Sequence, residues 1–290
     1  MATDVRPAGL SRRGRLNFLL TNRIPRRWLT RLVGRLSRVE SEWFAALCIG
    51  VWRLFARDLD LGEAKQTRFR SMQECFTREL KEGARTIDDD PAVLVSPCDG
   101  IAVSHGRIRG TELLQAKGFP YTLEELLGDP ALVERYRDGC YVTLRLKSSF
   151  YHRFHAPCDG SMQEVNYISG DTWNVNPPAL ERIERLYCKN ERVVMDLELP
   201  AAGEHVSLVA VAAILVASVR LHCLPQDLDL RYRGPNRLPC DAGFRKGDEL
   251  GYFQQGSTII VFANGRFEPV AGVATGRTLR MGQALLRRRG

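Results

Sequence analysis

Apolar and arginine residues alternate with helical spacing near the amino terminus of the chain. Between residues 26 and 39 the apolar positions recur every three or four residues, and arginines occupy positions between them. The apolar set is Trp28, Leu29, Leu32, Val33, Leu36 and Val39, and the arginines are Arg26, Arg27, Arg31, Arg35 and Arg38. This period predicts an amphipathic helix over 26–39. The apolar residues of 41–57 and of 68–82 predict two further helices.

From about residue 90 onward the pattern changes to short β-branched runs separated by Gly, Pro, Asn and Asp, which is typical of strands and turns. The predicted strands are Ala92–Val95, Ile101–Ile108, Tyr141–Leu146, Glu164–Ile168, Val193–Leu199, Val206–Val219 and Thr258–Phe262. A short helix over 122–127, with Thr122 as its cap and Glu125 three residues later, interrupts them. We therefore expect an α+β protein, with a helical region over 1–85 and a β-rich domain over 86–290.

Positive charge is concentrated in the same amino-terminal segment. Residues 1–57 contain twelve arginines and three acidic residues, a net charge of +9, so the rest of the chain carries −1 of the total of +8. Arginine on one helix face and tryptophan on the other is typical of helices that lie in a membrane interface. Three alternatives stay open: a hairpin packed on its own domain, an organelle transit peptide, and a nucleic-acid-binding arm, which the neutral body disfavours.

Several other classes of protein receive no support from the sequence. The longest apolar run, Leu208–Val219, falls short of the about 20 residues that span a bilayer, and a buried strand or strand pair explains it better. No apolar segment near the start precedes a small-residue cleavage site, so we expect no secretory signal. The eight cysteines show no Cys-x-x-Cys spacing and no neighbouring histidine array, so we expect free buried thiols, a reducing compartment and no metal.

One tetrapeptide occurs twice in the β-rich region. Pro-Cys-Asp-Gly ends at Gly100 and again at Gly160, and each copy is a turn signature followed by a predicted strand. A duplicated hairpin unit would explain the repeat. Such duplication is common in half-barrel folds, and the chain resembles biotinyl and lipoyl carrier domains in this respect, although the carrier lysine hairpin is absent.

The dipeptide Gly256-Ser257 is a possible site of self-cleavage. A serine hydroxyl can attack the preceding carbonyl, convert the amide into an ester and leave by β-elimination, which produces a pyruvoyl group. A serine nucleophile needs a base, and the base needs an orienting acid. Asp99 lies in the first repeated turn, and His152 and His155 stand three residues apart beside the second. A His-x-x-His pair alone is more often structural or part of a metal site than catalytic.

Six blocks stand in order along the chain: Ser96-Pro-Cys-Asp-Gly100, Gln115-Ala-Lys-Gly118, Tyr151-His-Arg-Phe-His-Ala-Pro157, Val175-Asn-Pro177, Asn190-Glu-Arg-Val193 and Gly256-Ser-Thr258. With these blocks the chain resembles the pyruvoyl-dependent phosphatidylserine decarboxylase family, from Pro25 to Phe262. The resemblance implies that Asp99, His155 and Ser257 form a self-processing triad, in which His155 is the base and Asp99 orients it. His152 matches the family histidine implicated in decarboxylation.

The resemblance also implies the products and partners of the reaction. Cleavage between Gly256 and Ser257 would leave a β chain, 1–256, and an α chain, 257–290, that begins with the pyruvoyl cofactor. The amine of phosphatidylserine would form a Schiff base with the pyruvoyl carbonyl, which makes the chain a carboxy-lyase that yields phosphatidylethanolamine in phospholipid biosynthesis. Lys117 and Asn176 would line the substrate pocket.

The implied substrate places the protein at a membrane. Since phosphatidylserine stays in an anionic bilayer, we expect a peripheral protein on the cytoplasmic face of the bacterial cell membrane, or alternatively on the mitochondrial inner membrane, as a homodimer without nucleic acid. Two other functions stay open, a serine hydrolase with an uncut Asp99, His155 and Ser257 triad and a non-enzymatic membrane-binding module. Two positions depart from the family: Gln255 replaces an apolar residue or glycine, and Phe150 replaces an aspartate that could partner His152.

Overall fold

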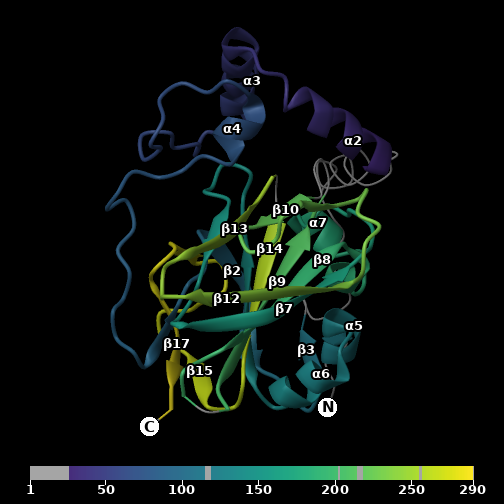
Figure 1. The fold of residues 1–290 in the computed structure, drawn as a ribbon, viewed down its shortest axis with the longest axis vertical. Helices are drawn as coiled ribbons and strands as arrows, with labels where there is room; N and C mark the ends of the chain where they lie inside the picture. Colours follow the sequence, from purple (N-terminus) through teal and green to yellow (C-terminus); the bar gives the residue numbers. More distant parts are fainter. Residues whose placement is uncertain (1–25, 115–118, 202, 214–217, 255–256, 290) are drawn as a thin grey trace.

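The computed structural model describes residues 26–114, 119–201, 203–213, 218–254 and 257–289, without the side chains of 26–28 and 257. Within these residues the largest sheet has eight antiparallel strands (Figure 1). In spatial order they are β12 (Arg237–Phe244), β7 (Gly160–Ile168), β8 (Arg192–Glu198), β9 (His205–Ala212), β14 (Ser257–Ala263), β5 (Cys140–Arg145), β2 (Gly100–Arg107) and β16 (Thr278–Leu279). The prediction of a β-rich α+β protein is confirmed.

The central strand β14 is buried on both faces of this sheet. Ile259 and Val261 join one hydrophobic core, and Ile260 and Phe262 join a second core on the opposite face. Successive side chains of a strand point to opposite faces, so a strand between two cores must be apolar at every position. This is why the run Ile-Ile-Val-Phe does not alternate with polar residues.

Different elements cover the two faces. One core contains residues of four short helices, α5 (Leu123–Leu127), α6 (Pro130–Tyr136), α7 (Pro177–Leu180) and α8 (Leu186–Lys189). The other core contains residues of two smaller sheets. These are β11 (Leu228–Asp229), β10 (Ser218–Leu221), β13 (Glu249–Phe253) and β6 (Arg153–His155), and β1 (Val93–Val95), β17 (Ala284–Arg288) and β15 (Phe267–Pro269). A separate hairpin joins β3 (Glu112–Leu114) to β4 (Pro120–Thr122).

The two copies of Pro-Cys-Asp-Gly begin two strands of the eight-stranded sheet. Gly100 opens β2 and Gly160 opens β7. A Cβ at Gly160 would lie 2.4 Å from the carbonyl oxygen of Glu198, and a Cβ at Gly100 would lie 2.9 Å from the Cβ of Leu144. Each turn therefore ends in glycine because the neighbouring strand passes too close for a side chain.

Helices α2 (Arg26–Leu36) and α3 (Glu42–Phe55) lie at one end of the molecule, beyond the strand ends (Figure 1). They lie within the ranges 26–39 and 41–57 where two helices were expected, and Ser41 caps α3 through a hydrogen bond from the amide of Phe44. The helix predicted over 68–82 is wrong in length, since α4 spans only Met72–Phe76. The chain leaves the helix at Thr77, and Leu80 then forms a bridge to Ala64.

Other predictions are confirmed or corrected in detail. Thr122 and Glu125 form the predicted capping box of α5. The run Val206–Val219 divides between β9 and β10, which belong to different sheets. The expectation that all cysteines are free is wrong, because Cys223 and Cys240 form a disulfide. Cys223 follows β10 and Cys240 lies in β12. The fold places their Cα atoms 5.6 Å apart, which is within the range of disulfides. No helix among the described residues is long and apolar enough to cross a membrane.

Candidate active site

His155 closes strand β6 beside the first repeated turn. Its backbone amide donates to the carbonyl of Pro97 at 2.7 Å, which holds this turn against the histidine. In the ring, Nδ1 lies 2.8 Å from the carbonyl oxygen of Gly247, and Nε2 lies 2.9 Å from the hydroxyl of Tyr151. A carbonyl only accepts, so Nδ1 carries the proton and Nε2 keeps a lone pair. His155 is therefore held in the tautomer that a base acting through Nε2 requires.

Asp99 is held in the turn by groups other than His155. Arg85 pairs with both carboxylate oxygens, Nε with Oδ1 at 3.0 Å and Nη2 with Oδ2 at 2.5 Å, and the amide of Met281 donates to Oδ1 at 2.8 Å. The orienting bond predicted for Asp99 is therefore made by Gly247. Burial lowers the pKa of His155, whereas the bond to Gly247 and the negative charges of Glu249 and Asp99 oppose this lowering. Asp99 acts on the imidazole through its charge.

His152 is fully buried behind the ring of Phe76 in α4. The two ring centroids lie 3.9 Å apart. Nδ1 lies 2.9 Å from the carbonyl oxygen of Phe150, and Nε2 has no hydrogen-bond partner among the residues that the structure describes. The backbone carbonyl of Phe150 thus accepts the hydrogen bond that an aspartate side chain at this position could accept. Burial and then the charge of Arg78 lower the pKa of His152 to about 3, so the ring is neutral near pH 7 and offers Nε2 as an acceptor.

This burial predicts acid sensitivity. Because the folded protein keeps His152 neutral down to about pH 3 while the unfolded chain takes up a proton below about pH 6.5, acidification favours unfolding between these values. The slope is at most about 1.4 kcal/mol per pH unit for each such histidine. We expect the thermal midpoint to fall less between about pH 7.5 and about pH 5 in His152→Gln than in wild type. His105→Gln, on β2 outside this site, is the control; equal falls in wild type and His152→Gln would contradict the prediction.

The chain at the predicted cleavage site enters the central sheet. Ser257 begins β14 and pairs with Ala212, and Thr258 pairs with Arg145 of β5. Gln255, Gly256 and Lys117 lie outside the described residues. His152 neighbours this segment, since its carbonyl accepts from the amide of Phe253 at 3.0 Å. The fold thus brings the histidine motif, the first turn and the start of β14 to one region, although Asp99, His152 and Ser257 lie far apart in the sequence.

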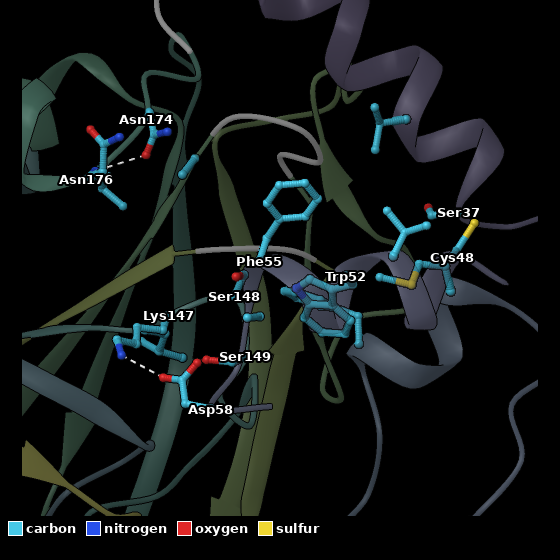
Figure 2. Close-up of a pocket in the computed structure, with 18 of the residues that line it drawn as sticks. Ser37, Cys48, Trp52, Phe55, Asp58, Lys147, Ser148, Ser149, Asn174 and Asn176 are labelled. Carbon is cyan, nitrogen blue, oxygen red and sulfur yellow. Dashed lines mark hydrogen bonds and ion pairs between the residues drawn. The ribbon is translucent and has the colours of Figure 1, made fainter. Parts of the chain in front are cut away.

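A cavity of about 770 Å³ lies between the amino-terminal helices and the end of β5 (Figure 2). Its helical wall is apolar and includes Phe44, Val51, Trp52, Phe55 and Phe76. The opposite wall is polar and consists of residues 145–149 and 174–176. Ala213, next to the partner of Ser257, also lines the cavity. An apolar wall facing a polar wall suits an amphipathic ligand.

The polar wall contains groups that are already paired. Lys147 donates to Asp58 at 2.6 Å, and this bond lowers the pKa of Asp58 (Figure 2). Asn176, a predicted pocket residue, does line the cavity, where its side chain also caps α7 by accepting from the amide of Ala179. Asn174 accepts from the amide of Asn176 at 3.0 Å.

Three residues of this region were not identified from the sequence. Arg78 is buried and donates to the carbonyls of Cys75, Ser149 and Phe150, which fixes the loop before the histidine motif. Nothing distinguishes it from the other arginines of the chain. Tyr151 could have been found, because it stands inside the motif. Arg38, in the turn after α2, donates to the side chain of Gln254, the residue after β13, at 2.9 Å.

Among the residues that the structure describes, no three histidine, cysteine, aspartate or glutamate side chains gather as metal ligands.

Known proteins with similar sequences identify the family of this chain. The family model for phosphatidylserine decarboxylase matches residues 72–287. A phosphatidylserine decarboxylase proenzyme of Vibrio parahaemolyticus is 35% identical over 272 residues, which cover 89% of this chain and 94% of the relative. The proenzymes of Sodalis glossinidius, 36% identical over 85% of this chain and 86% of the relative, and of Dickeya dadantii, 35% identical over 93% and 92%, are similar. The chain belongs to the phosphatidylserine decarboxylase family.

Proposed function

We propose that this protein decarboxylates phosphatidylserine to phosphatidylethanolamine after cutting its own chain between Gly256 and Ser257. The observation that carries the proposal is the amphipathic cavity, which adjoins the sheet edge where Ser257 enters β14. A lipid has an apolar part for the helical wall and a charged head group for the polar wall. The family membership supports the same substrate and a proenzyme that is processed.

His155 is the base of self-processing in this proposal. Its Nε2 lone pair would take the proton of the Ser257 hydroxyl once the Tyr151 hydroxyl moves aside, and the charge of Asp99 would stabilise the imidazolium. The serine oxygen attacks the carbonyl of Gly256, and the amide becomes an ester. β-Elimination of the ester then releases residues 1–256 with a terminal carboxylate. Water hydrolyses the imine left at residue 257, so the nitrogen of this residue leaves as ammonia and a carbonyl takes its place.

The site fits the pyruvoyl group that this chemistry would leave on residue 257. The group supplies a carbonyl that binds an amine and accepts the electron pair left when carbon dioxide departs. The unpaired Nε2 of His152 is a buried polar atom without a purpose in the fold, next to the segment that leads to Ser257. We assign it to the decarboxylation step.

His152 would hold and return a proton during turnover. A histidine with a pKa of about 3 is a poor acid at neutral pH. A substrate anion nearby would raise the pKa of His152, since an opposite charge within about 4–6 Å favours the protonated ring. The arrangement would therefore make the proton available mainly when substrate is bound.

Helix α3 supports binding to a membrane surface. Its apolar side chains at positions 43, 47, 51, 54 and 55 form one stripe along the helix and are largely exposed, Trp43 to 75%, Leu54 to 72% and Phe55 to 85%. Because Phe55 also lines the cavity, this stripe leads from the protein surface into the site. We place residues 1–85 on an anionic membrane, with the arginines of α2 near lipid phosphates. The cytoplasmic face of the bacterial membrane is the proposed location.

Removing the stripe should weaken binding to vesicles. We expect Trp43→Ala with Leu54→Ala to lower partitioning onto vesicles of phosphatidylglycerol and phosphatidylserine roughly tenfold or more, because burying each such side chain is worth about 1.5–3 kcal/mol. Vesicle sedimentation measures the partitioning. Leu114→Ala is the matched control, since Leu114 is an exposed leucine of β3, far from α3 (Figure 1). Equal partitioning of the double variant and wild type would contradict the membrane proposal.

The catalytic domain, residues 86–290, would then contain the reacting residues, while residues 1–85 contribute the helical wall of the cavity. The two Pro-Cys-Asp-Gly turns, each opening a strand of one sheet, are consistent with a duplicated half-barrel unit. Both fragments of the cut chain would stay together, because β14 of the small fragment pairs with β9 and β5 of the large one.

A decarboxylation assay separates this function from the rivals. Purified protein given phosphatidylserine labelled with carbon-13 in the serine carboxyl group should release labelled carbon dioxide and phosphatidylethanolamine. A serine hydrolase with an uncut triad would release fatty acid or free serine instead. A non-enzymatic membrane module would bind the vesicles and leave the lipid unchanged.

A further inference from the structure

Arg145 is a cation in the cavity wall that has no hydrogen-bond or ion-pair partner among the described residues. It is the last residue of β5, is half-buried and lines the cavity. Its Nε atom is inaccessible to solvent and makes no hydrogen bond. Burial lowers the pKa of Arg145, and the neighbouring Tyr187 opposes this lowering, while no carboxylate of the described residues contributes. The fold thus leaves an arginine partly desolvated with no group to satisfy it.

The other buried arginines among the described residues each donate hydrogen bonds through the guanidinium group, although Nε of Arg78 also has no partner. Arg85 pairs with Asp99 and Glu63, Arg78 donates to three backbone carbonyls, and Arg192 donates to the carbonyls of residues 125, 126, 188 and 190. Lys147, two residues after Arg145 in the same wall, is paired with Asp58. Since a buried charge is normally paired, the exception at Arg145 indicates an anion that comes from outside the chain.

The position of Arg145 relates it to the reacting residue. It pairs across the sheet with Thr258, and opposite residues of an antiparallel pair have Cα atoms about 4.5–5.5 Å apart. Ser257 is the next residue along the chain, about 3.8 Å further between Cα atoms. Because successive side chains alternate between the faces of a sheet, a substrate bound at residue 257 would reach Arg145 around the end of β14, where this strand begins.

Two further polar groups lie beside Arg145. The hydroxyl groups of Thr258 and Tyr187 are both buried and lie close to each other, and neither bonds to any other group of the described residues. Burial raises the pKa of Tyr187, and both Arg145 and Thr258 oppose this rise, which makes the three side chains neighbours. An anion at Arg145 would have hydroxyl donors nearby as well as the guanidinium.

We propose that Arg145 binds the phosphodiester of the phosphatidylserine head group and thereby sets the position of the serine amine and carboxylate at residue 257. This inference rests on the proposed function. The substrate has two anionic groups, a carboxylate and a phosphodiester, and only one of them keeps its charge through the reaction. The carboxylate loses its charge as carbon dioxide leaves, so an ion pair to it would stabilise the ground state and slow the reaction. The phosphodiester keeps its charge in substrate and product, so Arg145 can hold it throughout.

The test compares Arg145→Gln, Arg145→Lys and wild type as full-length, processed proteins in mixed micelles of detergent and phosphatidylserine. We expect Arg145→Gln to be cleaved normally and to show a KM raised about 10- to 100-fold, the usual effect of losing a charge-assisted hydrogen bond, with kcat changed less than about threefold. Arg145→Lys should recover part of the KM, because lysine keeps the charge without the bidentate geometry. Arg237→Gln removes the same charge from a strand outside the cavity and should keep the wild-type KM.

Soluble head groups identify the anion. Glycerophosphoethanolamine should inhibit wild type competitively, and Arg145→Gln should lose this inhibition. Ethanolamine, which lacks phosphate, should inhibit wild type and Arg145→Gln weakly and to the same extent. Inorganic phosphate that inhibits wild type as strongly as glycerophosphoethanolamine would contradict binding of a head group. A lower kcat at unchanged KM, or an Arg145→Gln chain that stays uncut, would also overturn the proposal. Wild-type protein that is uncut or inactive would instead refute the proposed function itself.

Discussion

Ser257→Ala protein is expected to remain one uncut chain of 290 residues and to release no carbon dioxide from phosphatidylserine. Alanine lacks the hydroxyl that attacks the Gly256 carbonyl, so neither the ester nor the later elimination can form. Both processing and activity should fall below detection together, since the serine is consumed to make the reactive carbonyl. A denaturing gel and the carbon dioxide assay measure the two effects on one preparation.

Thr258→Val is the matched control for this substitution. It removes the adjacent hydroxyl, which is buried and makes no hydrogen bond in the structure, and keeps the β-branched shape that suits the strand. We expect Thr258→Val to be cut. A Ser257→Ala chain that is still cut, or one that is uncut yet decarboxylates, would show that Ser257 is not the residue transformed.

His152→Ala should slow decarboxylation and leave self-cleavage unchanged. We expect complete cleavage, because His155 is the proposed base of processing, and a decarboxylation rate reduced about 10²- to 10⁴-fold, the usual contribution of a positioned proton donor or acceptor. The reason is the unpaired, buried Nε2, which has a clear place in turnover and none in holding the fold. Single-turnover release of carbon dioxide by cleaved protein measures the loss.

His155→Ala provides the contrast to His152→Ala, since it removes the base and should leave the chain uncut. The same gel therefore distinguishes the two histidines, which stand three residues apart in sequence. His155 contacts Gly247 and Tyr151. His152 contacts Phe150 and Phe76. A cleaved His152→Ala protein with full activity would remove His152 from the reaction.

Much of the fold follows from local sequence patterns. The amphipathic period of α2 and the capping residues of α5 are local signals, and both helices formed where predicted. The helix over 68–82 was predicted too long because its apolar residues also suit the loop that packs Arg78 against the histidine motif. The short helix α6 and the later strands were missed, since tertiary packing rather than periodicity defines such short elements.

The candidate site was predictable as a set of residues, and its contacts were not. The ordered blocks pointed to Asp99, His152, His155 and Ser257, and the fold brings the segments of all four to one region. No sequence pattern could show that a backbone carbonyl orients His155, that Arg85 holds Asp99, or that Arg145 lacks a partner. Those facts depend on contacts between segments far apart in the chain. The Cys223–Cys240 disulfide was missed for the same reason.

The intact mass of the purified wild-type protein tests the central proposal most directly. We predict two chains, residues 1–256 and residues 257–290, with the smaller lighter by one ammonia than a chain that begins with serine, as a pyruvoyl terminus requires. Reduction with borohydride should add hydrogen to the small chain and abolish decarboxylation. A single uncut chain that decarboxylates phosphatidylserine, or a small chain that begins with unmodified serine in active protein, would contradict the proposal.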